Sequence, residues 1–227
     1  MKVAFLGKGG SGKSTLATAL VQHLARAGVS VLAIDADHNM DLSYNLGADP
    51  SVFLGSDPSL IKKHVGLDTD ATFAEVRKTA LDKQLAFHLS PMDEFTLRMT
   101  IEVSEKVRLM TAGPHTDIVR SGEHCSHSLA APLKVYLPLL QLGPDEWVVI
   151  DERAGTDPVA TGILAGVDLA VIVEEPTVYS QRVAKQIAHE LTLAKVSHIV
   201  VHNKHAGVEG DTAAMVETVM AYKKQKK

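Results

Sequence analysis

Five short runs of consecutive apolar residues restrict the fold of this 227-residue chain more than any other feature. They lie at 3–6, 31–34, 147–150, 169–173 and 198–201 and are rich in Val, Ile and Leu. A strand with one wet face alternates apolar and polar residues, whereas these runs do not, which is typical of strands covered on both faces in a parallel sheet. Parallel neighbours need long crossover connections, so helices are expected on both faces of the sheet.

The stretches between the runs carry the periodicity of helices. Residues 14–27 place a leucine on one stripe every fourth position and end at Gly28, a residue suited to a left-handed C-cap, and residues 180–193 repeat the pattern. Strand and helix therefore alternate. The sequence predicts an α/β fold with a single doubly wound, mostly parallel sheet and helices on both faces, and we assign residues 1–227 to one domain.

The segment 50–113 follows this alternation less well. Its periodicity predicts a helix at 71–81, and the alternating stretch 97–109 predicts a hairpin that turns at 104–106. We assign the segment to the same domain, and the sequence does not indicate what it contributes to function.

Charge and composition restrict the binding partners and the cellular compartment that can be expected for this chain. The net charge is −4 and the sequence pI is about 6.2, so the overall balance gives no attraction to nucleic acid or to an anionic membrane. The sequence has no apolar run of 18 residues, and residues 1–6 lead directly into a glycine-rich loop without room for a cleavable signal. A single cysteine, Cys125, cannot form an internal disulfide. We expect a cytoplasmic protein.

A phosphate-binding loop is the most specific motif. Residues 7–14, Gly-Lys-Gly-Gly-Ser-Gly-Lys-Ser, satisfy G-x-x-x-x-G-K-[ST] between a predicted strand and a predicted helix. The glycines let backbone N–H groups face the phosphates, and the helix adds its positive dipole end. Lys13 would reach the β- and γ-phosphates, and the Ser14 hydroxyl would ligate Mg²⁺. The predicted nucleotide contacts are Gly7, Lys8, Gly9, Gly10, Ser11, Gly12, Lys13, Ser14 and Thr15.

Lys8 adds a distinguishing feature. A lysine directly after the first glycine cannot easily reach the phosphates of its own loop, so it is placed to reach toward a second molecule. Residues 7–15 resemble the deviant Walker A motif of the ATPase superfamily that contains MinD, ParA and the nitrogenase iron protein. The resemblance implies an ATP-dependent homodimer in which Lys8 crosses to the partner's nucleotide.

Two further segments resemble the switches of that superfamily. Residues 35–41 resemble the first switch, which implies that Asp37 orients the attacking water or the Mg²⁺ shell, with Asp41 as the alternative for the water. The apolar strand at 147–150 ends in Asp151, as a Walker B element requires, and Asp151 is a candidate in the second shell of Mg²⁺. Residues 151–155, Asp-Glu-Arg-Ala-Gly, also match the second switch.

The base preference is indicated by residues 203–206, Asn-Lys-His-Ala. A guanine-binding Asn-Lys-x-Asp sequence would have a carboxylate where this chain has Ala206, so the donors of guanine would stay unpaired. ATP is therefore favoured over GTP. The resemblance implies that Asn203 contacts adenine, and Lys204 is assigned to the same site.

Residues 121–127, Ser-Gly-Glu-His-Cys-Ser-His, resemble the region in which the CooC-like carbon monoxide dehydrogenase accessory ATPases carry Gly-Glu-Gly-Cys-x-Cys before a helix. Here His127 replaces the second cysteine. One cysteine per chain cannot supply four thiolates to an iron–sulfur cluster shared by two subunits, which argues against a redox role. Cys125 and His127 from two subunits would make a Cys₂His₂ set for Zn²⁺ or Ni²⁺, with His115 and His124 as additional donors. The alternative is an inert thiol with solvated histidines.

Together these features predict a Mg²⁺-dependent ATPase that dimerises around ATP and acts as a switch on a metalloenzyme client, in nickel-centre maturation. The alternative is a positioning ATPase that acts on membrane or DNA. For that alternative, the apolar residues within 215–222 and the lysines after them could form a membrane-surface helix. We expect instead an ordinary last helix packed on the sheet.

Overall fold

The computed structural model describes residues 1–122, 126–204 and 211–225. In these residues seven strands form one sheet in the order β4-β5-β2-β7-β1-β8-β9, and every neighbouring pair is parallel except β4 and β5. The five predicted runs are all strands, and the predicted hairpin is β4 and β5. The run at 198–201 differs from the expectation in one respect, because it forms an edge strand that is only partly buried. The strands are β1 (Lys2–Gly7), β2 (Ser30–Asp35), β4 (Thr100–Ser104), β5 (Val107–Thr111), β7 (Glu146–Asp151), β8 (Leu169–Glu174) and β9 (His198–His202).

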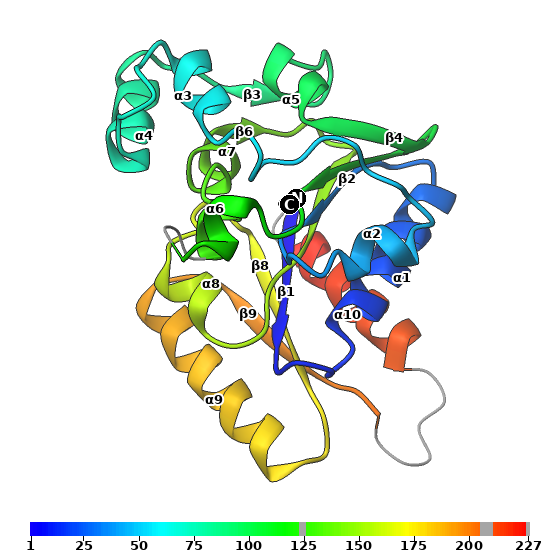
Figure 1. Cartoon of the computed structure of the whole chain (residues 1–227). Coiled ribbons are helices and arrows are strands. Elements are labelled where there is room, and N and C mark those ends of the chain that lie inside the picture. Colours follow the sequence, from blue (N-terminus) through cyan, green and yellow to red (C-terminus); the bar gives the residue numbers. More distant parts are fainter. Residues whose placement is uncertain (123–125, 205–210, 226–227) are drawn as a thin grey trace.

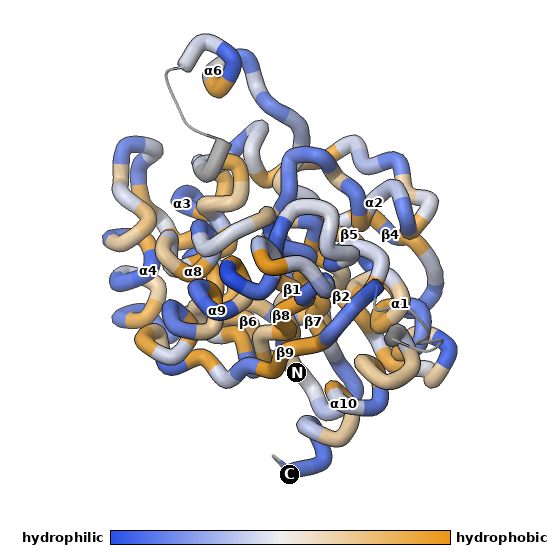
Figure 2. The backbone as a smooth tube through the Cα atoms, turned by 90° about the horizontal axis from the view of Figure 1, so that it is seen from below, coloured by the Kyte–Doolittle hydropathy of each residue, from blue (hydrophilic) through white to orange (hydrophobic). Residues whose placement is uncertain are grey.

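Helices cover both faces of the sheet, as predicted (Figure 1). On one face α1 (Lys13–Arg26) and α10 (Asp211–Gln225) pack over inward residues of the strands. On the other face the cover is α7 (Leu133–Leu139), α8 (Asp157–Ala160) and α9 (Val178–Leu193). The central strands are buried at every position, which explains why their sequences lack alternation. In Figure 2, hydrophobic residues, coloured orange, gather around the central strands of the sheet.

The segment 50–113 contributes three helices at one end of the molecule, at the top of Figure 1. The predicted helix is present, and a reciprocal capping box between Thr72 and Glu75 fixes its start. The rings of Phe87, Phe95 and Tyr136 of α7 pack against one another at tilted angles of 45–57°, with centroids 4.9–5.6 Å apart, and join this segment to the core. The elements here are α3 (Ser59–Val65), α4 (Phe73–Asp82), α5 (Glu94–Arg98) and a two-stranded sheet of β3 (Phe87–His88) and β6 (Leu140–Gln141).

The last helix packs on the sheet. Met215, Val216 and Val219 of α10 are buried in the core on the α1 side. Lys223 lies over the ring of Trp147, with its Nζ 4.6 Å from the ring centroid. The apolar side of α10 is therefore used inside the fold, which confirms the expected packing. Among the described residues, none of the helices combines the length and the apolar character needed to cross a bilayer.

Candidate nucleotide site

The predicted site residues meet because three parallel strands end side by side. β7 lies between β1 and β2, and the register places Asp35 and Asp151 next to each other at the carboxyl edge of the sheet. The phosphate loop, residues 7–14, leaves β1 at that same edge and enters α1 at Lys13. In open parallel sheets this edge is where ligands bind.

The loop wraps a cavity of about 320 Å³ at the start of α1. Lys13 is 7% exposed and directed into the interior of the site, close enough to Asp151 and Glu152 to affect their ionisation. A backbone in left-handed conformation at Gly12 (φ 98°) turns the chain into the helix and leaves its first N–H groups available to an anion. The cavity is lined by Gly10, Gly12, Lys13, Ser14, Thr15, Asp41, Asn45 and Lys204.

Asp151 is a buried carboxylate with the surroundings expected of a group that binds a cation. It is 1% exposed, lies close enough to the Ser14 hydroxyl for that group to favour its charged form, and its Oδ1 has no hydrogen-bond partner among the described residues. Burial raises the pKa of Asp151 to about 8, against the opposing effects of the Ser14 hydroxyl and the Lys13 charge. A hydroxyl and a buried carboxylate side by side suit Mg²⁺, which keeps several waters and needs few protein ligands. Ser14 and Asp151 are the residues that would hold it.

The first-switch residues lie on the neighbouring turn, after β2. Asp37 accepts a hydrogen bond from the backbone N of Asn39 at 3.2 Å, and its Oδ1 lies 3.1 Å from Nδ1 of His38. Asp41 begins the short helix α2 (Asp41–Asn45), is exposed and lines the cavity. Asp41 is therefore beside the phosphate loop, and Asp37 lies close enough to Asp151 and Glu152 for its charge to raise their pKa values.

Asp35 anchors this turn and has no role in the sequence interpretation. It is fully buried, and its Oδ2 accepts hydrogen bonds from both the backbone N and the hydroxyl of Ser43 at 2.8 Å. Burial raises the pKa of Asp35 to about 6 despite these hydrogen bonds. The contact ties the end of β2 to α2 and so restrains the turn that carries Asp37. A Ser eight residues after an Asp gives no recognisable signal in the sequence.

Glu152 and Arg153 lie in the segment that resembles the second switch, but neither was predicted as an individual site residue. They follow Asp151 and are 1% and 7% exposed, and neither the Glu152 carboxylate oxygens nor Nε and Nη2 of Arg153 have hydrogen-bond partners among the described residues. Burial raises the pKa of Glu152 to about 7, while the charge of Arg153 opposes the increase. Buried polar groups without partners are costly, so this turn is a place where water or phosphate would be accommodated.

Three residues from two segments outside the loop, Glu175, Asn203 and Lys204, hold its outer side. Asn203 donates from its amide to the carbonyl of Ser11 at 2.8 Å, and Lys204 donates to the carbonyl of Gly10. Lys204 Nζ also lies 2.9 Å from Oε1 of Glu175, and Lys8 Nζ lies 3.5 Å from Oε2 of the same carboxylate. Asn203 and Lys204 therefore contact the loop in the structure. Glu175 was not predicted, because its role depends on two lysines that are distant in sequence.

The predicted metal site falls largely outside the described part of the chain. Cys125 and His124 are outside it, and the side chain of His127 is not described. His115 is described and stacks on His38, with ring centroids 4.2 Å apart and planes inclined by 19°. Among the described residues, no three His, Cys, Asp or Glu side chains are grouped so that they could hold a metal ion. The zinc or nickel site stays a prediction.

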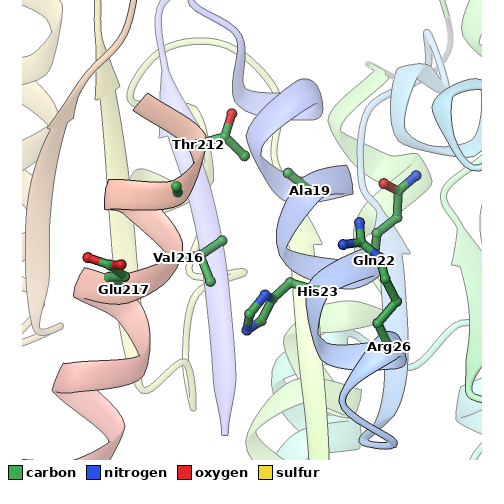
Figure 3. A pocket seen from close by; sticks show the side chains of 8 residues that line it. Ala19, Gln22, His23, Arg26, Thr212, Val216 and Glu217 are labelled. Atoms are coloured by element: carbon green, nitrogen blue, oxygen red, sulfur yellow. The ribbon is translucent and has the colours of Figure 1, made fainter. Parts of the chain in front are cut away.

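A second groove, of about 570 Å³, lies between α1 and α10 (Figure 3). His23 and Arg26 of α1 and Val216 and Glu217 of α10 are among the side chains on its walls. It takes no residue from the phosphate loop or the switch turns. The groove is therefore separate from the predicted nucleotide site.

Comparison with known proteins agrees with this geometry. The chain is 31% identical to the carbon monoxide dehydrogenase accessory protein CooC of Rhodospirillum rubrum, over 88% of this chain and 73% of that protein. It is 30% identical to an uncharacterised ATP-binding protein of Methanocaldococcus jannaschii, over 82% of this chain and 72% of the relative.

Solved structures share the fold at lower identity. A ParA family ATPase from Chlorobium tepidum superimposes with a TM-score of 0.56 at 20% identity, covering 97% of this chain and 80% of that one. MinD from Pyrococcus horikoshii, in complex with Mg-ADP, gives 0.55 at 18% identity, covering 92% and 72%. The family model described as the CobQ/CobB/MinD/ParA nucleotide binding domain matches residues 3–225. The chain therefore belongs to the CobQ/CobB/MinD/ParA nucleotide-binding family of P-loop ATPases.

Proposed function

We propose that this protein hydrolyses ATP with Mg²⁺ and uses the ATP cycle as a switch. The observation that carries the proposal is the meeting of Lys13, Ser14 and Asp151 beneath the phosphate loop, where Oδ1 of Asp151 and the carboxylate of the adjacent Glu152 are buried without hydrogen-bond partners among the described residues. Bound Mg²⁺ would neutralise phosphate charge there. Water attacks the γ-phosphate in line, Asp37 orients the water with Asp41 as the alternative, and Lys13 stabilises the developing charge. Asn203 is the proposed contact for adenine.

The proposal includes an ATP-dependent homodimer. Large apolar side chains are exposed on the segments that border the site. Tyr44 in α2 is 85% exposed and precedes Asn45, which lines the cavity, and Val178 and Tyr179 at the start of α9 are 86% and 63% exposed and follow Glu175, which pairs with Lys8. Exposed apolar groups around one site favour association. A two-fold dimer would bury the same face of both subunits and bring the partner's Lys8 toward the γ-phosphate.

The proposed client is a metalloenzyme that receives nickel. The support is the 31% identity to a carbon monoxide dehydrogenase accessory protein and the Cys-Ser-His sequence at 125–127. We propose that Cys125 and His127 of two subunits hold Zn²⁺ or Ni²⁺ on the dimer axis. Membrane positioning has less support, because the apolar side of α10 is packed in the core.

Two lysine variants test the ATPase part. Lys13→Ala should lose measurable ATP binding by calorimetry, because the phosphates lose their main buried cation. Lys8→Ala should bind ATP as the parent monomer does, yet show neither ATP-dependent dimer in analytical ultracentrifugation nor hydrolysis. Parental ATP affinity in Lys13→Ala would contradict the loop assignment, and a normally dimerising, active Lys8→Ala would contradict the role across the dimer.

Metal analysis tests the client part. Each chain offers one thiol and one imidazole at 125–127, so nickel- or zinc-loaded dimer should contain one ion per two chains. Cys125→Ser should lose the ion and keep the ATP affinity of the monomer. An ion-free parent, or equal metal content in Cys125→Ser, would leave an ATPase without a metallocentre.

A further inference from the structure

Glu175 occupies a well-defined position between two nucleotide-site lysines. It follows β8, and its backbone N donates to the Ser180 hydroxyl at 3.0 Å. Its carbonyl accepts from the backbone N of Thr177 at 2.7 Å, and the Thr177 side chain caps α9 by accepting from the N of Ser180. These contacts fasten the backbone at the start of α9 and so set where the carboxylate lies.

Each of the two carboxylate oxygens of Glu175 pairs with a lysine from a different segment. Oε1 lies 2.9 Å from Lys204 Nζ, and Oε2 lies 3.5 Å from Lys8 Nζ. Lys8 also donates to the carbonyl of Gly9 at 3.2 Å, so its ammonium is turned back onto its own subunit. The hydrogen bond from Lys204 is the main cause that holds the pKa of Glu175 below its usual value, with the charges of Lys204 and Lys8 adding to it. Glu175 therefore carries a negative charge in this position.

We propose that Glu175 holds Lys8 on its own subunit in the nucleotide-free monomer, and that ATP-dependent dimerisation requires Lys8 to exchange this carboxylate for the phosphates of the partner's ATP. The inference rests on the proposed role of Lys8 across the dimer. A carboxylate and a phosphate are both strong partners for an ammonium group. Glu175 and the partner's phosphates therefore compete for the single ammonium group of Lys8. Glu175 thus opposes dimerisation until ATP supplies the stronger partner.

Because Glu175 pairs with both Lys8 and Lys204, little free energy is needed for Lys8 to leave it. When Lys8 leaves, Glu175 keeps Lys204, so no acidic group is left without a cation. Lys8 is also 33% exposed and its contact at 3.5 Å is long, so the contact is a weak one that a phosphate can replace.

The test compares dimer dissociation constants in analytical ultracentrifugation with a non-hydrolysable ATP analogue. Glu175→Gln should tighten the dimer by about two- to fivefold, because the competing partner of Lys8 has lost its charge. Lys8→Ala itself is expected to form no ATP-dependent dimer, and Glu175→Gln in that background should not restore one. The matched control is Glu174→Gln, which removes the neighbouring carboxylate that pairs with His202 at 3.1 Å rather than with Lys8, and should leave the dimer constant unchanged.

A second measurement separates this inference from the proposed function. In nucleotide-free monomer with ¹³C-methylated lysines, the Lys8 resonance should shift in Glu175→Gln and not in Glu174→Gln. An unshifted resonance overturns the holding contact, and an equal or weaker dimer in Glu175→Gln overturns the competition. If instead Lys8→Ala dimerises like the parent, the proposed role of Lys8 fails and the competition fails with it, while the resonance still decides whether Glu175 holds Lys8.

Discussion

At the scale of the residue, Gly12 shows how backbone conformation and packing combine at the nucleotide site. Its φ of 98° is unfavourable for any side chain, and a Cβ there would collide with the amide of Asn203, whereas Gly10 (φ 79°) faces open space. Gly12→Ala should therefore lower the free energy of unfolding by about 2–3 kcal/mol, and Gly10→Ala by about 1 kcal/mol from backbone strain alone. Urea unfolding of the two variants measures both values. Equal losses would mean that the Asn203 contact does not restrict this position.

At the scale of the element, the packing of α10 makes residues near the end of the chain part of the core. Met215 is 1% exposed in the cluster beneath α1, whereas Glu217 on the same helix faces solvent. Met215→Ala should cost about 2–5 kcal/mol of stability through lost burial and a residual cavity. Glu217→Ala should change stability by about 0.5 kcal/mol at most. Chemical denaturation provides the comparison, and a Met215→Ala variant as stable as the parent would mean that α10 is not part of the folded core.

At the scale of the whole molecule, buried acids at the carboxyl edge of the sheet make stability depend on pH. The pKa values of Asp35, Glu152 and Asp151 are raised by burial to about 6, 7 and 8. Each group then holds its proton more tightly in the folded chain than in the unfolded chain, where the values are near 4. Their contribution is fully present below about pH 4 and is lost as pH rises through the folded values. The nucleotide-free protein should therefore lose stability between pH 5 and pH 8.

The matched variant for this prediction is Asp151→Asn, which cannot ionise. Unfolding measured at pH 5, 6, 7 and 8 should show the variant gaining stability relative to the parent as pH rises, since the parent increasingly has to bury a charged Asp151. A difference between the two proteins that stays constant with pH would show that Asp151 ionises as freely in the fold as in the unfolded chain.

The sequence alone predicted the five strands, the hairpin and the phosphate loop, because each is a local pattern. It was wrong about the cover of one strand: β9 lies at the edge of the sheet and is only partly buried, with Val200 43% exposed. An apolar run, a turn and a glycine-rich loop are recognisable within ten residues, and helix α4 carries its own start signal in Thr72 and Glu75. The roles expected for Lys13, Ser14 and Asp151 likewise came from motif spacing, and the structure brings these three together.

Only the tertiary structure decided which distant groups meet at the loop. Glu175 reaches Lys8 across 167 positions, and Asn203 reaches Ser11 across 192. Asp35 is joined to Ser43 by the fold of a turn that has no sequence signature. The contacts that Glu175 and Asn203 make with the loop exist because β1, β8 and β9 are neighbours in the sheet and their carboxyl ends open on the same edge. Strand order is set by how the helices pack on both faces, and that information is distributed over the whole chain rather than contained in any one segment.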